Sequence, residues 1–330
     1  MIRLQPRSMA GLLVLGLVAL CASATSGQPG APVPPPIASV HIPGLITAPL
    51  PLHITRSSRS RFTLDAIVIR PDQPGRFPLA VLTHGEPYDF AETKAWLPTI
   101  MIFPAIMLAQ HGYAAVAFLR RGFGTSDGPY VEDHGPGRGG PGGYCGPRHY
   151  LTAAQASADD VLGALSVLRT EPWVDPQRTL LVGQSSGGVA VTAAAGRDSS
   201  GIAGIVSFAP GRGSMDMNTL CKPDLVFNMW HTLGRSVRVP SLWIFAQNDQ
   251  YFSPTIADLL FNAYTSAGAP AKFVETPPFG SDGHMLFYWA PPQTWWPPVS
   301  TFLDGIHMPT RTVVDLPPQL EQRLGEPISQ

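Results

Sequence analysis

A serine lies between two glycines directly after an apolar run. Residues 183–187 read Gly-Gln-Ser-Ser-Gly, and residues 179–182 read Thr-Leu-Leu-Val. The apolar run predicts a buried strand, and the alanine-rich segment after the motif predicts a helix. A G-x-S-x-G motif in this context is typical of a serine nucleophile held on a strained turn, where glycines are needed because backbone segments approach too closely for side chains. Ser185 is therefore the candidate nucleophile; the alternative is a turn that merely joins strand to helix.

A serine hydroxyl needs a histidine base, and the histidine needs an acid that orients it. On a strand-turn-helix scaffold of this kind the chain order is Ser, then Asp or Glu, then His. Asp249 comes just after the strongly apolar residues 241–246. Sites of open α/β sheets lie beyond the carboxyl ends of the strands, so Asp249 is the predicted acid. The alternative is that it only caps the helix that begins near Ser253.

His284 is the predicted base, because it ends a turn-rich loop after the strand predicted at 271–275. Asp282, two residues earlier, is interpreted as shaping that turn. The remaining candidate histidines precede the acid, follow the last predicted helix, or lie in a Pro-rich segment or at a helix end: His231, His307, His41, His53 and His111. One oxyanion donor is expected from the backbone N–H of Ser186, the residue after the nucleophile.

With these residues in place, the chain resembles the α/β-hydrolase superfamily, and within it the dienelactone-hydrolase-like and prolyl-oligopeptidase-like branch. The resemblance covers roughly residues 61–303 and is carried by His84-Gly85, by the Arg-Arg-Gly-x-Gly-x-Ser segment at 120–126, and by Ser185, Asp249 and His284. It implies the backbone N–H of Glu86 as the second oxyanion donor, with the Tyr88 phenol as a further candidate. Dienelactone hydrolases have cysteine where this chain has serine, so the resemblance implies the fold and the triad but not dienelactone as substrate.

The fold class predicted is α/β, with the α/β-hydrolase fold: a mostly parallel twisted sheet, helices on both faces and a small loop cap. The sheet is expected to begin at residues 61–69, and helices are expected at 92–110, 152–169, 186–197, 254–267 and 294–304. Residues 97–108 are very apolar and are broken by Pro98 and Pro104; they are interpreted as a buried helix rather than a membrane-touching lid. Residues 211–238 are the predicted cap, whose apolar side chains either face substrate or pack on the domain.

The first 24 residues have the features of a secretory signal peptide. Arg3 and Arg7 precede a short apolar run, and a small-x-small site predicts cleavage after Ala24. Lipid attachment at Cys21 is disfavoured because Leu20 before it is not small. The predicted organisation is thus signal peptide 1–24, Pro-rich arm or linker 25–60, catalytic domain 61–305 and C-terminal tail 306–330, in an exported protein.

Two cysteines remain after signal removal, Cys145 and Cys221. An even pair in an exported protein predicts a disulfide, here between two loops at the carboxyl edge of the sheet. The alternative is two unrelated buried thiols. Neither cysteine has a partner at metal-ligand spacing, so no metal site is inferred.

The composition suits a large globular core, with 44% hydrophobic residues and a net charge of −1. The near-zero charge gives no electrostatic case for nucleic acid or anionic membranes. The expected function is ester hydrolysis through an acyl-enzyme, on a small-molecule ester or short peptide and without a cofactor. Alternatives are a peptidase or amidase, an acyltransferase or thioesterase, and a hydrolase-like binding protein without catalysis. The oligomeric state does not follow from the sequence.

Overall fold

In the computed structural model, the described residues are 41–57, 60–87, 90–132 and 145–326. The predicted signal peptide, Cys21 and Tyr88 lie outside these ranges, as do residues 25–40 and 58–59 of the predicted arm.

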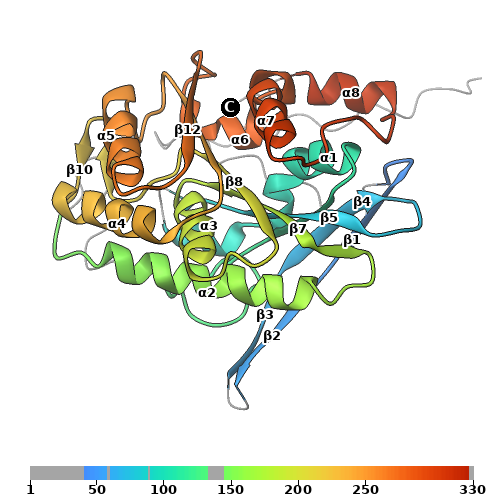
Figure 1. Cartoon of the computed structure of the whole chain (residues 1–330), viewed down its shortest axis with the longest axis horizontal. Helices are drawn as coiled ribbons and strands as arrows, with labels where there is room; N and C mark the ends of the chain where they lie inside the picture. Colours follow the sequence, from blue (N-terminus) through green and yellow to red (C-terminus); the bar gives the residue numbers. More distant parts are fainter. Residues whose placement is uncertain (1–40, 58–59, 88–89, 133–144, 327–330) are drawn as a thin grey trace, which may run out of the picture. The chain divides into compact units, whose positions relative to one another are not determined.

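Eight strands form one sheet in the order β1-β4-β6-β5-β7-β8-β11-β12 (Figure 1). Their bounds are β1 (Leu45–Pro49), β4 (Ala66–Pro71), β5 (Phe77–Thr83), β6 (Ala114–Phe118), β7 (Val174–Gln184), β8 (Ile202–Phe208), β11 (Ser241–Ala246) and β12 (Ala271–Thr276). β4 pairs antiparallel with β1 and β6, and all pairings from β6 to β12 are parallel. This confirms the predicted mostly parallel sheet.

Helices cover both faces of the sheet, as predicted. One face carries α2 (Tyr150–Leu168), α3 (Ser186–Arg197), α4 (Pro223–Ser236) and α5 (Pro254–Thr265); the other carries α1 (Ile102–Gln110), α6 (Leu286–Trp289) and α7 (Pro292–Gly305). Successive side chains of β7 point to opposite faces of the sheet. Leu181 packs in the core beneath α2 to α5, while Leu180 and Val182 pack in the core beneath α1, α6 and α7. Leu324 of α8 (Pro318–Leu324) also joins the second core.

The connections diverge at β5 and β7, which are neighbours in the sheet. From β5 the chain leads to β6 on one side, and from β7 it leads to β8 on the other. A crevice opens beyond the carboxyl ends of strands where the connections diverge in this way, and it is the usual ligand position in open α/β sheets. His84 follows β5 and Ser185 follows β7, so both lie at this point.

The sheet begins earlier than the sequence predicts. β1 lies within the segment expected to be an arm or linker, and β2 (Leu52–Ser57) forms an antiparallel hairpin with β3 (Ser60–Leu64). Leu52 and Ile54 are buried in the core beneath α2. Their alternation is a strand signal that the Pro- and Ser-rich composition around it obscured.

The helix predicted at 92–110 is broken into η2 (Phe90–Ala95), η3 (Pro98–Met101) and α1. The residue before a proline avoids helical backbone, and Leu97 is extended at φ −124° and ψ 151°. The four other predicted helices form within two residues of their expected ends.

The predicted loop cap is more regular than expected. Residues 211–238 contain a small hairpin of β9 (Ser214–Asp216) and β10 (Thr219–Leu220), followed by α4. Met229 and Trp230 of α4 are fully buried in the core, so these two side chains pack on the domain instead of facing substrate.

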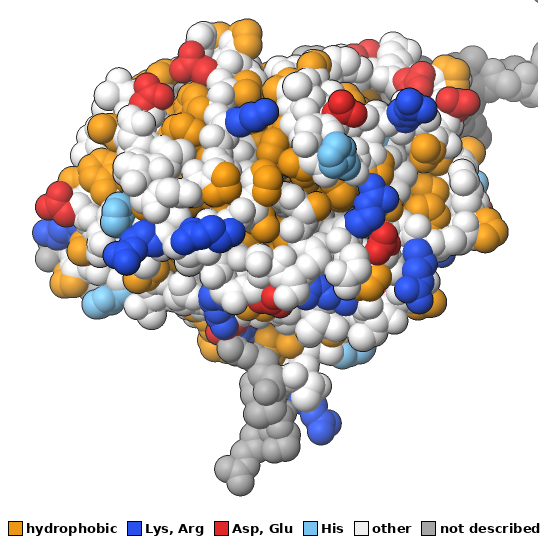
Figure 2. Space-filling model, in the orientation of Figure 1, with side chains coloured by type: hydrophobic (Ala, Val, Ile, Leu, Met, Phe, Trp, Pro, Cys, Tyr) orange, Lys and Arg blue, Asp and Glu red, His pale blue; other side chains and the backbone are white. Residues whose placement is uncertain are grey.

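Charged side chains of both signs are scattered among apolar and neutral ones on the face seen in Figure 2. That face has no large patch of one sign, in line with the net charge of −1. None of the helices formed by the described residues is long and apolar enough to cross a membrane.

Candidate active site

Ser185 sits on a strained turn between β7 and α3. Its backbone has φ 53° and ψ −120°, a conformation that side-chain-bearing residues rarely adopt. A Cβ on Gly183 would lie 2.3 Å from the carbonyl oxygen of Gly187, and one on Gly187 would lie 2.4 Å from that of His84. The predicted steric reason for both glycines is therefore confirmed: only glycine lets the turn close and lets it pack on the loop after β5.

Asp249 and His284 are in direct contact. The imidazole Nδ1 lies 2.9 Å from Asp249 Oδ2 and 3.1 Å from Oδ1. Asp249 is fully buried, and its Oδ1 also accepts the backbone N–H groups of Tyr251 at 2.8 Å and Phe252 at 2.9 Å. These bonds fix the carboxylate so that it faces the imidazole ring.

Asp282 has a different position from Asp249. It caps η4 (Gly283–Met285) and accepts the backbone N–H of His284 at 2.8 Å and that of Gln250 at 3.0 Å. Asp282 thus holds the turn, as the sequence predicted.

The His284 loop packs against the ends of β7 and β11. The side-chain amide of Gln184 donates to the carbonyl of His284 at 3.1 Å. A Cβ on Gly283 would lie 2.5 Å from Ala246 Cβ, so a larger residue would push the loop away. The Tyr251 ring stacks on the imidazole with centroids 4.2 Å apart. The structure therefore brings the loops of Ser185, Asp249 and His284 to one edge of the sheet.

The environment raises the pKa of His284 above its ordinary value. Burial alone lowers it, but the charge of Asp249, its hydrogen bond and the charge of Asp282 outweigh that effect. With Nδ1–H directed at Asp249, the other ring nitrogen of the neutral imidazole has a lone pair that can accept a proton.

The loop after β5 rests on the Ser185 turn. A Cβ on Gly85 would lie 2.1 Å from Gln184 Oε1 and 3.0 Å from Ser185 Cβ. The backbone N–H of Gly85 donates to the Tyr288 hydroxyl at 2.9 Å, and that hydroxyl donates to Gln184 Oε1 at 3.0 Å. Position 85 therefore has no room for a side chain. The hydrogen bonds through Tyr288 to Gln184 fix the place of its backbone.

Known proteins resemble parts of this chain in sequence or in fold. A family model described as serine aminopeptidase, S33, matches residues 104–235, which include Ser185. The chain has the α/β-hydrolase fold, and the segment that contains Ser185 resembles a family of serine hydrolases. The resemblance predicted from the sequence is thus confirmed for the fold and the class of enzyme.

Solved structures similar to this hydrolase share its fold at low identity. An esterase from Pyrococcus furiosus is 16% identical with a TM-score of 0.52, covering 78% of this chain and 92% of that chain. An acylaminoacyl peptidase from Pyrococcus horikoshii is 14% identical with a TM-score of 0.51, covering 84% of this chain and 44% of that chain. No curated protein sequence matches the chain.

The hydrolase also contains a buried ion cluster that includes Glu86 of the loop after β5. Its other members are Arg120, Glu132 and Arg212. Glu132 pairs with both arginines, and Arg212 also binds Glu86 Oε1 at 2.8 Å. The side chains of Arg120, Glu132 and Arg212 are fully buried and that of Glu86 is 19% exposed. Two positive and two negative charges cancel, which is needed because an unpaired charge here would be strongly destabilising. The Tyr130 hydroxyl also donates to Glu86.

This cluster was not predicted from the sequence. Arg120 belongs to the motif that carries the resemblance, but no role was assigned to it. Glu132 lies 12 residues from Arg120 and 80 residues from Arg212, so neither pair has a local spacing signal. The one available hint was an arginine pair directly after a buried strand in a chain with only 14% charged residues.

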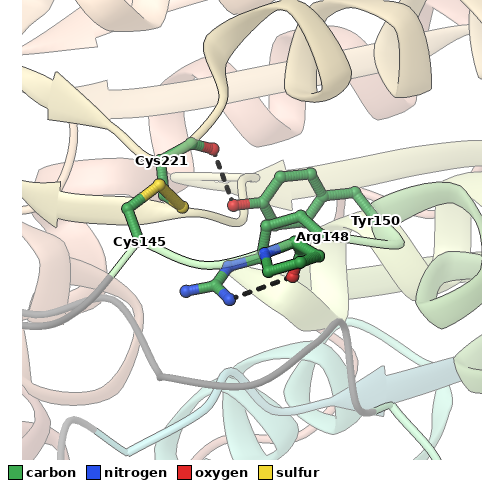
Figure 3. Close-up of a disulfide and its surroundings, with 5 residues drawn as sticks. Cys145, Arg148, Tyr150 and Cys221 are labelled. Carbon is green, nitrogen blue, oxygen red and sulfur yellow. Dashed lines mark hydrogen bonds between the residues drawn. A yellow bond between two sulfur atoms is a disulfide. The ribbon is translucent and has the colours of Figure 1, made fainter.

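The predicted disulfide between Cys145 and Cys221 is present, with Cα atoms 5.4 Å apart (Figure 3). The Tyr150 hydroxyl points at the Cys221 carbonyl and donates to it at 2.8 Å. The backbone N–H of Cys221 donates to the Gly213 carbonyl at 2.8 Å. The disulfide therefore links the segment that follows Arg212 to the residues just before α2.

Proposed function

We propose that this hydrolase cleaves carboxylic esters by transferring the acyl group to Ser185 and then to water. His284 takes the proton from the Ser185 hydroxyl as its oxygen attacks the ester carbonyl. The protonated imidazole then gives that proton to the leaving alcohol, and the ester C–O bond breaks. Water, deprotonated by His284, attacks the acyl-enzyme and releases the acid. Asp249 holds the tautomer and stabilises the imidazolium.

The developing oxyanion is held by the backbone N–H groups of Ser186 and Glu86. Ser186 is the first residue of α3, whose amino terminus carries a partial positive charge. A carboxylate near an oxyanion would oppose the reaction, but the Glu86 side chain is engaged by Arg212 and Tyr130. This pairing supports a backbone role for Glu86.

The observation that carries the proposal is the contact between Asp249 and His284 at the sheet edge where the strained Ser185 turn lies. Strained backbone at a polar sheet edge is typical of a functional site.

The similarity to the Pyrococcus furiosus esterase, which is matched over 92% of its own chain, supports an ester as substrate. A serine aminopeptidase is the second candidate, favoured by the description of the matching family model.

Turnover of p-nitrophenyl esters from acetate to decanoate, beside aminoacyl p-nitroanilides, tests the proposal. Wild type should cleave esters with an optimum chain length, and Ser185→Ala should lose at least about 10³-fold in kcat. Anilide cleavage that exceeds ester cleavage in kcat/KM would favour the aminopeptidase. Ester turnover that survives Ser185→Ala would contradict the mechanism.

We also propose that the protein is exported after cleavage following Ala24. The disulfide supports this proposal, because disulfides persist in oxidising compartments. Sequencing the amino terminus of the protein recovered outside the cytoplasm should give Thr25 as the first residue. An intact Met1 in the exported protein would contradict the cleavage site.

A further inference from the structure

We propose that Arg120 is a positioning residue that sets the direction of both oxyanion donors. The inference rests on the proposed function, because it presupposes that the Glu86 and Ser186 N–H groups receive the oxyanion. Arg120 follows β6, is fully buried and is not part of the triad.

The guanidinium first fixes the loop after β5. Its Nη1 donates to Thr83 Oγ1 at 2.9 Å and to the His84 carbonyl, and its Nη2 lies 3.4 Å from the Gly85 carbonyl oxygen. The Gly85 carbonyl and the Glu86 N–H belong to one peptide group. The described part of the chain has no cis peptide, so the two bonds point in opposite directions. Because the Gly85 carbonyl is held toward Arg120, the Glu86 N–H points away from Arg120.

The backbone of Arg120 strengthens the same constraint through His84. The Arg120 N–H donates to His84 Nε2 at 3.0 Å, so the proton of the neutral ring is on Nδ1. That Nδ1–H donates to the Gly85 carbonyl at 2.7 Å. Burial, and then the charge of Arg120, lower the pKa of His84, which keeps the ring neutral. Two donors thus hold the Gly85 carbonyl, one from the Arg120 side chain and one arranged by its backbone.

The same guanidinium also reaches the second donor. Arg120 Nη2 donates to Ser186 Oγ at 3.0 Å, at the first turn of α3. The N–H groups of a first helical turn have no partner within the helix, so the Ser186 N–H is open to a ligand. Glu132 pairs with Nε and Nη2 of the same guanidinium. One planar side chain therefore ties the two oxyanion segments together, which a lysine with its single charged nitrogen could not do.

Arg121 offers a matched control. It is the next residue, it pairs with the buried Asp160, and its guanidinium lies over the Phe62 ring. None of these contacts involves the residues that hold the oxyanion. Replacing Arg121 therefore reports the cost of breaking a buried ion pair in this segment without touching the oxyanion donors.

The full-length variants Arg120→Lys, Arg120→Met, Ser186→Ala and Arg121→Lys should be compared with wild type on the best p-nitrophenyl ester. The inhibition constant for phenylboronic acid, which mimics the tetrahedral transition state, should be measured beside kcat and KM. Losing one oxyanion donor costs about 10²- to 10³-fold in kcat, so misdirecting the donors in Arg120→Lys should cost about 30- to 100-fold. KM should stay within about threefold, and boronate affinity should fall in parallel with kcat. Ser186→Ala keeps the backbone donor and should lose about three- to tenfold.

Several outcomes separate this inference from a purely structural role. An Arg120→Lys enzyme with kcat and boronate affinity within threefold of wild type overturns it, as does an equal kcat loss in Arg121→Lys. If the two Arg120 variants do not fold, Ser186→Ala decides: unchanged kcat and boronate affinity overturn the inference. If Ser185→Ala turns over the ester as fast as wild type, the proposed function itself is contradicted. If turnover requires Ser185 but Arg120→Lys is as active as wild type, only the positioning role is contradicted.

Discussion

The side-chain amide of Gln184 donates a hydrogen bond to the backbone carbonyl of His284, 100 residues further along the chain. The same side chain accepts the Tyr288 hydroxyl, which in turn accepts the Gly85 N–H. Gln184 directly precedes Ser185. One buried amide therefore links the nucleophile turn to the base loop and to the loop after β5.

Replacing Gln184 should disturb all three segments. Gln184→Ala leaves the His284 carbonyl and the Tyr288 hydroxyl without this partner, so we expect a loss of about 1–3 kcal/mol in the free energy of unfolding. We expect kcat to fall about tenfold because the base shifts relative to the nucleophile. Chemical denaturation and ester kinetics measure the two effects. Gln247→Ala is the control, because Gln247 lies at the same sheet edge and its side-chain amide donates to the exposed Glu275.

The activity should depend on the protonation of His284. Only the neutral ring accepts the Ser185 proton, and the pKa of His284 is raised, so kcat/KM should fall as the pH drops through a value above 6.5. Asp249→Asn removes the charge that raises this pKa. The acid limb of the pH profile should then move to lower pH, while kcat drops about 10³- to 10⁴-fold. An acid limb that stays in place in Asp249→Asn would contradict the assignment of the base and its partner.

The close approach at Gly187 predicts a large effect from one methyl group. A Cβ there would lie 2.4 Å from the His84 carbonyl oxygen, so Gly187→Ala must displace either the helix or the loop after β5. We expect kcat to fall at least about 100-fold, with a lower melting temperature. Gly305→Ala at the end of α7 is the control, because a Cβ there meets nothing within 4 Å. If Gly187→Ala and Gly305→Ala have the same kcat and melting temperature, the close approach of Gly187 to the His84 carbonyl is contradicted.

The disulfide should contribute to stability. It closes a loop with a sequence separation of 76, and a cross-link of this kind restricts the unfolded chain. Cys145→Ser with Cys221→Ser should lower the free energy of unfolding by about 2–4 kcal/mol. Denaturation of wild type with and without a reductant provides an independent measurement, and the reductant should leave the double variant unaffected. Unfolding curves of wild type that do not respond to reduction would argue against the bond.

The triad candidates could be predicted because their signals are local. Ser185, Asp249 and His284 each come after a predicted strand, and parallel strands place such loops at one edge of the sheet. The Gln184 bridge and the pairing of Arg212 with Glu132 depend on residues far apart in the chain. A single sequence carries no spacing that shows such contacts, and a buried arginine looks like an exposed one.

Two errors in the predicted fold have different causes. The break before Pro98 was visible in principle, because a proline restricts the residue before it, but the apolar run around it favoured one long helix. In α4 the buried residues Val226, Met229, Trp230 and Leu233 follow helical spacing. That signal was present, but residues 211–238 were interpreted as an insertion that forms a small cap, with packing on the domain left as the alternative.

Reaction of the folded protein with a fluorophosphonate, followed by mass mapping of the adduct, tests the central claim most directly. A serine activated by His284 displaces fluoride and keeps the phosphonyl group on its oxygen. We expect one adduct per chain on Ser185, none in Ser185→Ala, and labelling at least about 100-fold slower in His284→Ala. Adduct on a different residue, or no adduct on folded wild type, would contradict Ser185 as the nucleophile.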